Sequence, residues 1–241
     1  MTSVAAVIPA YNESSSLRRV VSGVRPHVHR VYVVDDGSSD DVGPVDAVVL
    51  RHERNRGKGA ALRTGMSAAL AAGFEAVVTL DGDGQHDPDA VPVLLEALSR
   101  ADLVIGSRSR SGTMPPSRKL SNGFSTVLVS LLLRRPIRDV HSGFRAYRAS
   151  RLRSVEIRSR RFEVEVELLL KAAQSGWRIV HVPVPTLYGT ERSKISPAMD
   201  TMRFLRAVAR HGLGLEWTWT RHAMGWFASS SKREASATRG Y

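Results

Sequence analysis

Short apolar runs alternate with amphipathic helical patterns over the first half of the chain, and this alternation limits the possible folds more than any other feature. The predicted strands cover residues 4–9, 31–35, 47–50, 77–81 and 103–107, and the predicted helices between them cover 13–24, 58–72 and 88–98. Strands that are joined through helices form a mostly parallel sheet. The sequence therefore predicts an α/β fold in which a mostly parallel sheet is flanked by helices within a single domain.

The second half of the chain has longer helical patterns and basic loops. Helices are predicted at 117–133, 162–173 and 197–211, a loop around 139–145 and a late strand at 179–185. We expect one domain over residues 1–212, an amphipathic aromatic segment over 213–228 and a disordered tail over 229–241. The tail is small and polar, and such a composition buries too little apolar surface to fold.

Polar residues gather where the predicted strands end, which is the edge at which parallel sheets bind ligands. The sharpest cluster is Asp81-Gly82-Asp83-Gly84-Gln85-His86. Two carboxylates one residue apart can hold Mg²⁺ or Mn²⁺ together with substrate phosphates. A calcium-binding EF-hand loop starting at Asp81 would need Gly at its sixth position and Glu at its twelfth, where the chain has His86 and Pro92. A plain Asp-Gly turn and a surface Asp pair remain alternatives.

Two further motifs follow the second and third predicted strands. In Asp35-Asp36-Gly37-Ser38 the adjacent carboxylates repel each other, which indicates a ligand, and Asp36 could accept a hydrogen bond from a nucleobase. A simple Asp-Gly turn is the alternative. The stretch Asn55–Ala60 is not a Walker loop, because no Ser or Thr follows Lys58. Glycines at a helix start can still hold a phosphate or a base edge, although Lys58 could equally be a solvated side chain.

The net charge of +12 is concentrated in the middle of the chain. Residues 100–161 contain 15 Lys and Arg against 3 Asp and Glu, whereas residues 1–99 contain 9 against 13. The basic clusters stand at 106–108, 118–119, 139–145 and 189–194. Arginine and lysine side chains that converge on the strand ends would bind several phosphate groups. A coding bias toward Arg explains a single surface Arg but not this clustering.

Other features restrict the class of protein. The chain has no cysteine, so disulfides and thiolate metal sites are excluded. Its N-terminal residues do not have the pattern of a signal peptide. The apolar run at 127–133 is far shorter than the roughly 20 residues that span a bilayer. We therefore expect a cytoplasmic protein.

Taken in order, these motifs resemble those of the family 2 glycosyltransferases with a GT-A (Rossmann-like) fold. The most similar subgroup is the dolichyl- or polyprenyl-phosphate mannose or glucose synthases. The resemblance covers residues 4–211. No single motif is specific for this family, but all of the motifs in this order are. The matching stretches are 7–13, 34–40, 55–60, 81–86, 106–108, 139–145 and 192–194.

The resemblance implies a role for each matching residue. Catalysis would depend on Asp83 and Arg108. The donor nucleotide would be bound by Pro9, Tyr11, Glu13, Asp36, Lys58 and Asp81. A Mg²⁺ or Mn²⁺ ion would be held by Asp81, Asp83 and Gln85. Donor or acceptor phosphates would be bound by Arg118, Ser142, Arg145, Arg192 and Lys194.

The expected reaction is metal-dependent, inverting transfer of a hexose from a GDP- or UDP-linked donor to a polyprenyl or dolichyl phosphate. A phosphate monoester is already ionised near neutral pH, whereas a hydroxyl acceptor needs a carboxylate to take its proton. No Glu-Asp or Asp-Asp pair after residue 100 offers such a base, which favours the phosphate. Glu163 and Glu165 keep the hydroxyl alternative open, although we interpret them as a solvated helix face.

Two other classes of protein, sugar nucleotidyltransferases and nucleic-acid-binding proteins, would explain only part of this sequence. A sugar nucleotidyltransferase would need a Gly-rich loop with Arg and Lys straight after the first strand, where the chain has Pro9-Ala10-Tyr11-Asn12-Glu13. A nucleic-acid-binding protein would explain the basic charge but not the Asp pairs. We expect no nucleic-acid partner.

Membrane contact is expected from the C-terminal segment. It contains Trp217, Trp219 and Trp226 among arginines, a pattern typical of segments that lie on a membrane surface. The protein would then be peripheral on the inner face of the membrane, with a lipid phosphate as its acceptor. Packing of the same residues on the catalytic domain, or a contact between copies in an oligomer, is the alternative.

Overall fold

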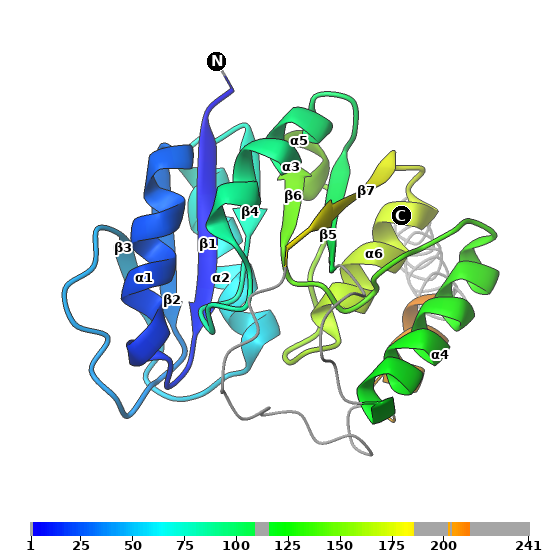
Figure 1. Ribbon diagram of the computed structural model, residues 1–241, viewed down its shortest axis with the longest axis horizontal. Coiled ribbons are helices and arrows are strands. Elements are labelled where there is room, and N and C mark those ends of the chain that lie inside the picture. The colour runs from blue at the N-terminus through cyan, green and yellow to red at the C-terminus, as the bar shows by residue number, and fades with distance from the viewer. Residues whose placement is uncertain (1, 109–115, 186–201, 203, 213–241) are drawn as a thin grey trace, which may run out of the picture.

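The computed structural model describes residues 2–108, 116–185, 202 and 204–212. Its centre is a seven-stranded sheet with the strand order β3-β2-β1-β4-β6-β5-β7 (Figure 1). The strands are β1 (Val4–Ala10), β2 (Arg30–Asp35), β3 (Val48–Arg51), β4 (Ala76–Thr79), β5 (Leu103–Arg108), β6 (Arg145–Arg148) and β7 (Ile179–Val184). Six strands run parallel, and β6 pairs antiparallel with both β4 and β5.

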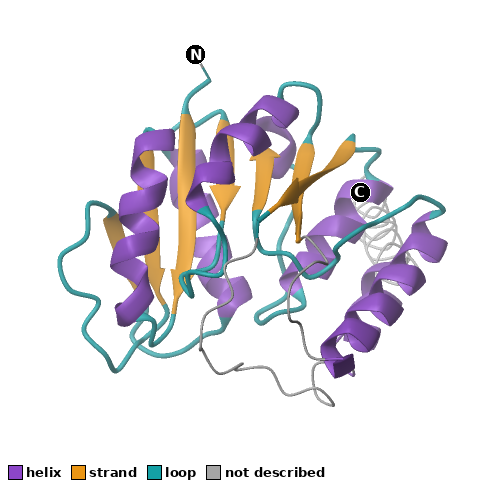
Figure 2. Ribbon diagram, viewed as in Figure 1, coloured by secondary structure: helices purple, strands orange, loops and turns teal. Residues whose placement is uncertain are grey.

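Helices cover both faces of this sheet (Figure 2). They are α1 (Ser14–Val24), α2 (Lys58–Ala71), α3 (Val91–Leu98), α4 (Pro116–Leu133), α5 (Ala149–Leu152) and α6 (Val164–Gln174). Short 3₁₀ turns stand at Arg25–His27 and Pro88–Ala90, and a π-helical turn at Val208–Gly212. Helices α1 and α3 pack on one face, and α2, α4 and α6 on the other.

Strand β1 shows why the sheet forms. All seven of its residues are buried, because β1 lies between β2 and β4 and is covered by helices on both faces. Successive side chains point to opposite faces, so Val7 joins the core under α2 while Ile8 joins the core under α1. A strand that is buried on both sides has a continuous apolar sequence, as the run Val-Ala-Ala-Val-Ile has here.

The α/β class and the mostly parallel sheet are confirmed, and the differences are local. The predicted strand at 77–81 ends at Thr79, which places Asp81 in the following loop. Strand β6 and helix α5 were not predicted. The sequence of β6, Arg-Ala-Tyr-Arg, has no apolar run, so the hydrophobic pattern did not reveal this strand. Its first residue, Arg145, is buried although it is charged, and it donates hydrogen bonds to backbone carbonyls.

Part of the C-terminal prediction can be compared with the structure. Residues 202 and 204–207, within the predicted helix at 197–211, are α-helical and are followed by the π-turn. The predicted segments 213–228 and 229–241 lie outside the described residues. Among the helices that the structure does describe, none has the length and apolar character to cross a membrane.

Candidate active site

The carboxyl ends of the parallel strands meet at the lower edge of the sheet in Figure 1, and a buried ion cluster lies there. Its centre is Lys58, the first residue of α2. The Lys58 Nζ atom lies 2.6 Å from Asp81 Oδ1 and 2.6 Å from Glu165 Oε1. The same ammonium lies 5.7 Å from the centre of the Phe162 ring. Residues from α2, the loop after β4 and α6 therefore converge on one point.

The charges in this cluster shift the pKa values of its members. Burial alone would raise the pKa of Asp81, but Lys58 and His86 outweigh burial and hold that pKa well below its usual range. Burial alone would lower the pKa of Lys58, but Asp81 and Glu165 raise it. For Asp83, burial and the charge of Asp81 raise the pKa. The two aspartates thus lie close enough to repel each other, and a cation would relieve that repulsion.

A glycine allows a second loop to approach the cluster closely. A Cβ atom added at Gly143 would lie 2.8 Å from Asp81 Oδ2 and 2.9 Å from Lys58 Nζ. The Gly143 carbonyl accepts a hydrogen bond from Thr79 Oγ1 at 2.8 Å, which fixes this loop to the end of β4. A larger residue at position 143 would displace either the loop 139–145 or the Asp81 and Lys58 side chains.

The donor atoms near Asp81 suit a hard divalent cation. Asp81, Asp83 and Gln85 are the residues expected to offer carboxylate and amide oxygens, and the Asp83 carboxylate accepts the backbone N–H of Gln85 at 3.0 Å. Within the described ranges, no group of three or more His, Cys, Asp or Glu side chains is arranged to hold a metal ion. Two carboxylates suit Mg²⁺ or Mn²⁺, which commonly takes its remaining ligands from water and substrate phosphates.

Asp36 organises the glycine-containing loop that precedes α2. Its buried carboxylate accepts the N–H of Arg56 at 2.9 Å and the N–H of Gly57 at 2.7 Å, and it contacts His52 Nδ1 at 2.6 Å. Gly57 has a φ of 93°, a conformation that favours glycine. The structure thus gives Asp36 a positioning role, and its contact with a nucleobase stays a prediction.

Helix α6 supports the same loop from the other side. The buried Glu167 carboxylate accepts the N–H of Ser159 at 2.7 Å, and the neighbouring Arg160 carbonyl accepts the N–H of Gly59 at 2.9 Å. Because Gly57 also has no side chain, the Arg160 carbonyl can pack directly against it. Lys58 is therefore fixed between two anchored glycines.

The loops after β1 and β2 are joined beside this cluster. Asn12 has a φ of 53°, its N–H donates to Ser38 Oγ at 3.0 Å, and its Oδ1 accepts the Ser39 N–H at 2.8 Å. A Cβ atom at Gly82 would lie 2.6 Å from Glu13 Oε2 and 3.2 Å from the Pro9 carbonyl. The predicted nucleotide-binding residues Pro9 and Glu13 thus stand beside the loop that carries Asp81. Tyr11 is 38% exposed in the same turn.

Arg108 ends β5 and forms a two-point ion pair with Asp139. The Arg108 Nε and Nη2 atoms donate to the two Asp139 carboxylate oxygens at 2.8 and 3.1 Å. Burial alone would raise the pKa of Asp139, but Arg108 lowers it. Burial, followed by the charges of Arg108 and Arg145, lowers the pKa of His141 to about 4. The loop 139–145 is therefore joined both to Arg108 and to the Asp81 cluster.

Two residues of that loop do not have the predicted role. Arg145 is completely buried and donates to the carbonyls of Ser142, Val140 and Glu165 at 2.7 to 2.8 Å. Ser142 is buried as well, and its hydroxyl donates to the Gly106 carbonyl at 2.6 Å. The expectation that Ser142 and Arg145 bind a phosphate is wrong, because both side chains are bonded to the backbone inside the core.

The remaining predicted phosphate-binding residues cannot be placed at the site. Arg118 falls in α4, but its side chain lies outside what the structure describes, as do Arg192 and Lys194 entirely. Their roles stay predictions.

Glu165 is a site residue for which the sequence-based interpretation was wrong. We interpreted it as part of a solvated helix face, yet it is 4% exposed and paired with Lys58. Burial raises its pKa more than Lys58 lowers it. The missed signal is the sequence Val164–Leu170, which places apolar residues all around the helix and therefore indicates burial on every side.

The sequence of this chain is similar to those of known glycosyltransferases. Residues 5–155 match the family described as Glycosyl transferase family 2. The chain is 34% identical to an undecaprenyl-phosphate mannosyltransferase of Micrococcus luteus, over 92% of this chain and 99% of the relative. It is 33% identical to a polyprenol monophosphomannose synthase of Mycolicibacterium smegmatis, over 74% and 75% of the two chains.

Two further relatives extend the comparison. A UDP-N-acetylglucosamine–dolichyl-phosphate N-acetylglucosaminyltransferase of Methanococcus voltae is 30% identical, over 76% of this chain and 84% of that protein. Among solved structures, glucosyl-3-phosphoglycerate synthase from Mycobacterium tuberculosis, in complex with Mn²⁺, UDP and glucosyl-3-phosphoglycerate, superposes with a TM-score of 0.72. That match has 22% identity and covers 88% of this chain and 80% of that one, so it shows the shared fold alone.

The family match covers more than half of the chain, and relatives of 30% identity or more cover most of it. On this basis the chain belongs to glycosyl transferase family 2 and is a glycosyltransferase with a GT-A fold.

Proposed function

We propose that this glycosyltransferase moves a hexose from a nucleoside diphosphate sugar to a polyprenyl phosphate, with inversion at the anomeric carbon. The observation that carries the proposal is the cluster at the end of β4. There the Asp81 and Asp83 carboxylates lie near Lys58, and Asp81 lies against Gly143 of the loop 139–145. The names of two relatives, an undecaprenyl-phosphate mannosyltransferase and a polyprenol monophosphomannose synthase, support this class of acceptor.

A divalent cation held by Asp81, Asp83 and Gln85 would neutralise the negative charge that builds on the departing nucleoside diphosphate. The chain's own groups do the rest. Lys58 holds Asp81 in place through its ion pair. Asp36 and Asn12 fix the two loops that would enclose the nucleoside. The Arg108 guanidinium is aligned by Asp139 at the end of β5, where it can face a phosphate.

The transfer itself is one displacement. An ionised oxygen of the acceptor phosphate forms a bond to the anomeric carbon while the bond from that carbon to the diphosphate oxygen breaks. The bonding electrons leave with the nucleoside diphosphate. No proton has to be removed from the acceptor, so the site needs positioning and charge stabilisation more than a general base.

Glu165 supports a second candidate reaction, transfer to a hydroxyl. It lies beside Asp81 with a raised pKa, as a general base would. However, its Oε1 contacts the Lys58 ammonium at 2.6 Å, and the side chain is only 5% exposed. An acid that is buried and already paired is poorly placed to take a proton from an acceptor, so we prefer the phosphate.

An exposed apolar stripe on α4 supports contact with a membrane. Phe124, Val127 and Leu131 are 57, 59 and 70% exposed, and their spacing of three and four residues places them on one face of the helix. Arg134 and Arg135 directly follow the end of α4 at Leu133. Apolar residues flanked by cations are typical of helices that lie on an anionic bilayer. We propose that this face brings the site to the lipid that carries the acceptor.

The test is a donor and acceptor panel with the full chain. GDP- and UDP-linked hexoses would be incubated with undecaprenyl phosphate in Mn²⁺ or Mg²⁺, and the transfer of labelled sugar to the organic phase measured. Undecaprenol, which has a hydroxyl in place of the phosphate, is the matched acceptor. Transfer to the phosphate and not to the alcohol is expected, and EDTA should abolish it. Transfer to undecaprenol, or full activity in EDTA, would contradict the acceptor or the metal respectively.

Glu165→Gln separates the two candidate reactions. The amide keeps the shape of the side chain but cannot accept a proton. Transfer to undecaprenyl phosphate should persist in this variant with a reduction of less than about tenfold, whereas loss of a general base typically costs about 10²–10⁴-fold. A loss of the larger size, in a protein that still folds, would contradict a transfer that needs no general base.

A further inference from the structure

A second charged cavity lies at the opposite end of the sheet from the active site. It has a volume of about 370 Å³ and is lined by Ser99, Arg100, Ala101, Asp102, Arg148, Arg151, Gly176 and Arg178. Asp102 and Arg178 precede the first residues of β5 and β7, and Arg148 ends the antiparallel β6. Because Arg108 stands at the other end of β5, the two sites are separated by the length of that strand, roughly 20 Å.

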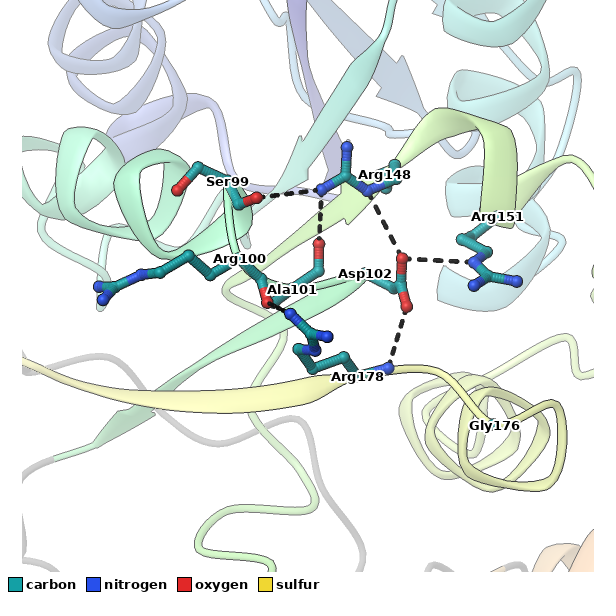
Figure 3. Close-up of a pocket in the computed structure, with 8 residues that line it drawn as sticks. All are labelled: Ser99, Arg100, Ala101, Asp102, Arg148, Arg151, Gly176 and Arg178. Atoms are coloured by element: carbon teal, nitrogen blue, oxygen red, sulfur yellow. Dashed lines mark hydrogen bonds and ion pairs between the residues drawn. The ribbon is translucent and has the colours of Figure 1, made fainter.

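Two guanidinium groups, those of Arg148 and Arg151, contact one carboxylate in this cavity, and Arg178 lies beside them with its guanidinium on the Arg100 carbonyl (Figure 3). The Arg100 side chain extends away from the cavity. The Asp102 Oδ1 atom lies 3.5 Å from Arg148 Nε and 3.3 Å from Arg151 Nε. The Asp102 Oδ2 atom accepts the backbone N–H of Arg178 at 3.0 Å. One negative charge therefore balances only part of the positive charge of Arg148, Arg151 and Arg178.

The backbone holds two of these side chains in place. Arg148 Nη2 donates to the carbonyls of Leu98 and Ala101, both at 3.0 Å. Arg178 Nη1 donates to the carbonyl of Arg100 at 3.0 Å. These bonds fix the guanidinium groups before any ligand arrives, which lowers the entropy lost on binding.

Several donors in the cavity still lack acceptors. Arg151 uses its Nε toward Asp102, and neither of its terminal nitrogens has a hydrogen-bond acceptor among the described residues. A guanidinium with two adjacent free donors matches two oxygens of one phosphate group. The cavity volume falls at the lower end of the range for small-molecule sites, about 300–1,000 Å³.

We propose that this cavity binds a phosphate-bearing anion, with Arg148, Arg151 and Arg178 as its ligands. The diphosphate group is the preferred size, since it offers oxygens to several guanidinium groups at once. The anion could be a free soluble diphosphate or the headgroup of an anionic lipid, because both present the same oxygens. This site is independent of the donor site at the end of β4 and needs no metal ion.

The test is calorimetric titration of the full chain with inorganic pyrophosphate in EDTA at low ionic strength. We expect one anion per chain, with an affinity that weakens as salt is added. Arg151→Ala and Arg178→Ala should each weaken binding about tenfold, the effect of losing one charge-assisted hydrogen bond. Arg151 and Arg178 carry exposed side chains, so both variants should fold.

Two matched variants make the test specific. Arg153→Ala removes an exposed arginine next to α5 that does not line the cavity, and it should bind as the unmodified chain does. Asp83→Asn changes the donor site and should leave pyrophosphate binding in EDTA unchanged. No binding, equal binding by all variants, or loss of binding in Asp83→Asn would each overturn the proposal.

Vesicles distinguish the two sources of the phosphate. Phosphatidylglycerol vesicles would be compared with phosphatidylcholine vesicles in co-sedimentation, with Arg151→Ala beside Arg153→Ala. Weaker sedimentation of Arg151→Ala alone would assign the cavity to a lipid headgroup. Equal sedimentation of the two variants, together with cavity-dependent pyrophosphate binding, would assign it to a soluble anion.

Discussion

The Lys58 ammonium lies 2.6 Å from the Asp81 carboxylate, so an internal cation already neutralises one of the two aspartates that we expect to bind a metal. The same ammonium also lies 2.6 Å from Glu165 Oε1. Metal and lysine would therefore share Asp81, and the strength of the Lys58 pair should set how tightly the free enzyme binds metal.

Lys58→Met should have two opposite effects. Removing one partner of a buried ion pair typically destabilises a protein by about 3–5 kcal/mol, so the free energy of unfolding in urea should fall. At the same time, Mn²⁺ should bind the free protein more tightly, because Asp81 loses its competitor. Lys171→Met is the matched control, since Lys171 pairs with the buried Glu167 away from Asp81. The Lys171→Met variant should be destabilised without any gain in Mn²⁺ affinity. An equal gain in Mn²⁺ affinity in Lys58→Met and Lys171→Met would contradict this account.

Asp83→Ala should abolish transfer and weaken donor binding only when metal is present. The expected loss in kcat is at least about 10²-fold, the size seen when one stabilising group at a developing charge is removed. Donor affinity would be measured by calorimetry with Mn²⁺ and with EDTA. Asp89→Ala changes a carboxylate that is 86% exposed in the same region and should behave as the unmodified protein. Transfer at the normal rate in EDTA would leave Asp83 with no metal role.

Asp36→Asn should raise the donor KM more than it lowers kcat. The carboxylate accepts two backbone N–H groups of the loop 52–57, and an amide can accept with only one of its two terminal atoms. The loosened loop would bind the nucleoside less well in the ground and transition states alike, which is the signature of uniform binding. A cost of about 1–3 kcal/mol in unfolding free energy is expected as well. A loss confined to kcat would place Asp36 in the chemistry instead.

Arg145→Met should impair folding, in contrast to Arg108→Met. Three backbone carbonyls lose their donor when the Arg145 guanidinium is removed, at about 1–3 kcal/mol for each unsatisfied group. Arg108 is 21% exposed at the strand end, so its loss should lower kcat with a smaller change in stability. Urea unfolding and transfer assays on both variants check this contrast. Equal stability of the two variants would return Arg145 to the list of ligand-binding candidates.

Stability should fall as the pH drops below about 6.5, because two histidines are held neutral in the fold. Burial, with nearby arginines, lowers the pKa of His141 and of His181 to about 4, from 6.5. Between these pH values the unfolded chain binds protons that the folded chain does not. The free energy of unfolding therefore decreases as the pH is lowered from about 6.5 to about 4. Each histidine contributes at most about 1.4 kcal/mol per pH unit. His181→Gln should reduce the slope measured by urea titration between about pH 7 and pH 5, and an unchanged slope would contradict this account.

Sequence reasoning went furthest where a motif and a strand end coincide. The position of Asp81 and Asp83 after a buried strand was predictable because parallel strands present their carboxyl ends at one edge. The burial of Arg145 was not, because an isolated arginine in a basic stretch looks the same whether it faces water or three backbone carbonyls. The pairing of Lys58 with Glu165 joins residues 107 positions apart, and only the folded chain shows it.

The four-residue strand β6 has a consequence for the order in which the protein can fold. Strands β4 and β5 never pair with each other, and β6 alone joins the β3-β2-β1-β4 half of the sheet to the β5-β7 half. During synthesis, the half that carries Asp36 and Asp81 can therefore assemble early with an open edge at β4. The half that carries Arg108 must wait until Arg145–Arg148 has left the ribosome. The two halves of the sheet are thus joined by one late and very short strand. A nascent chain that stops before it has the half that we expect to bind the nucleotide without the half that we expect to bind a phosphate.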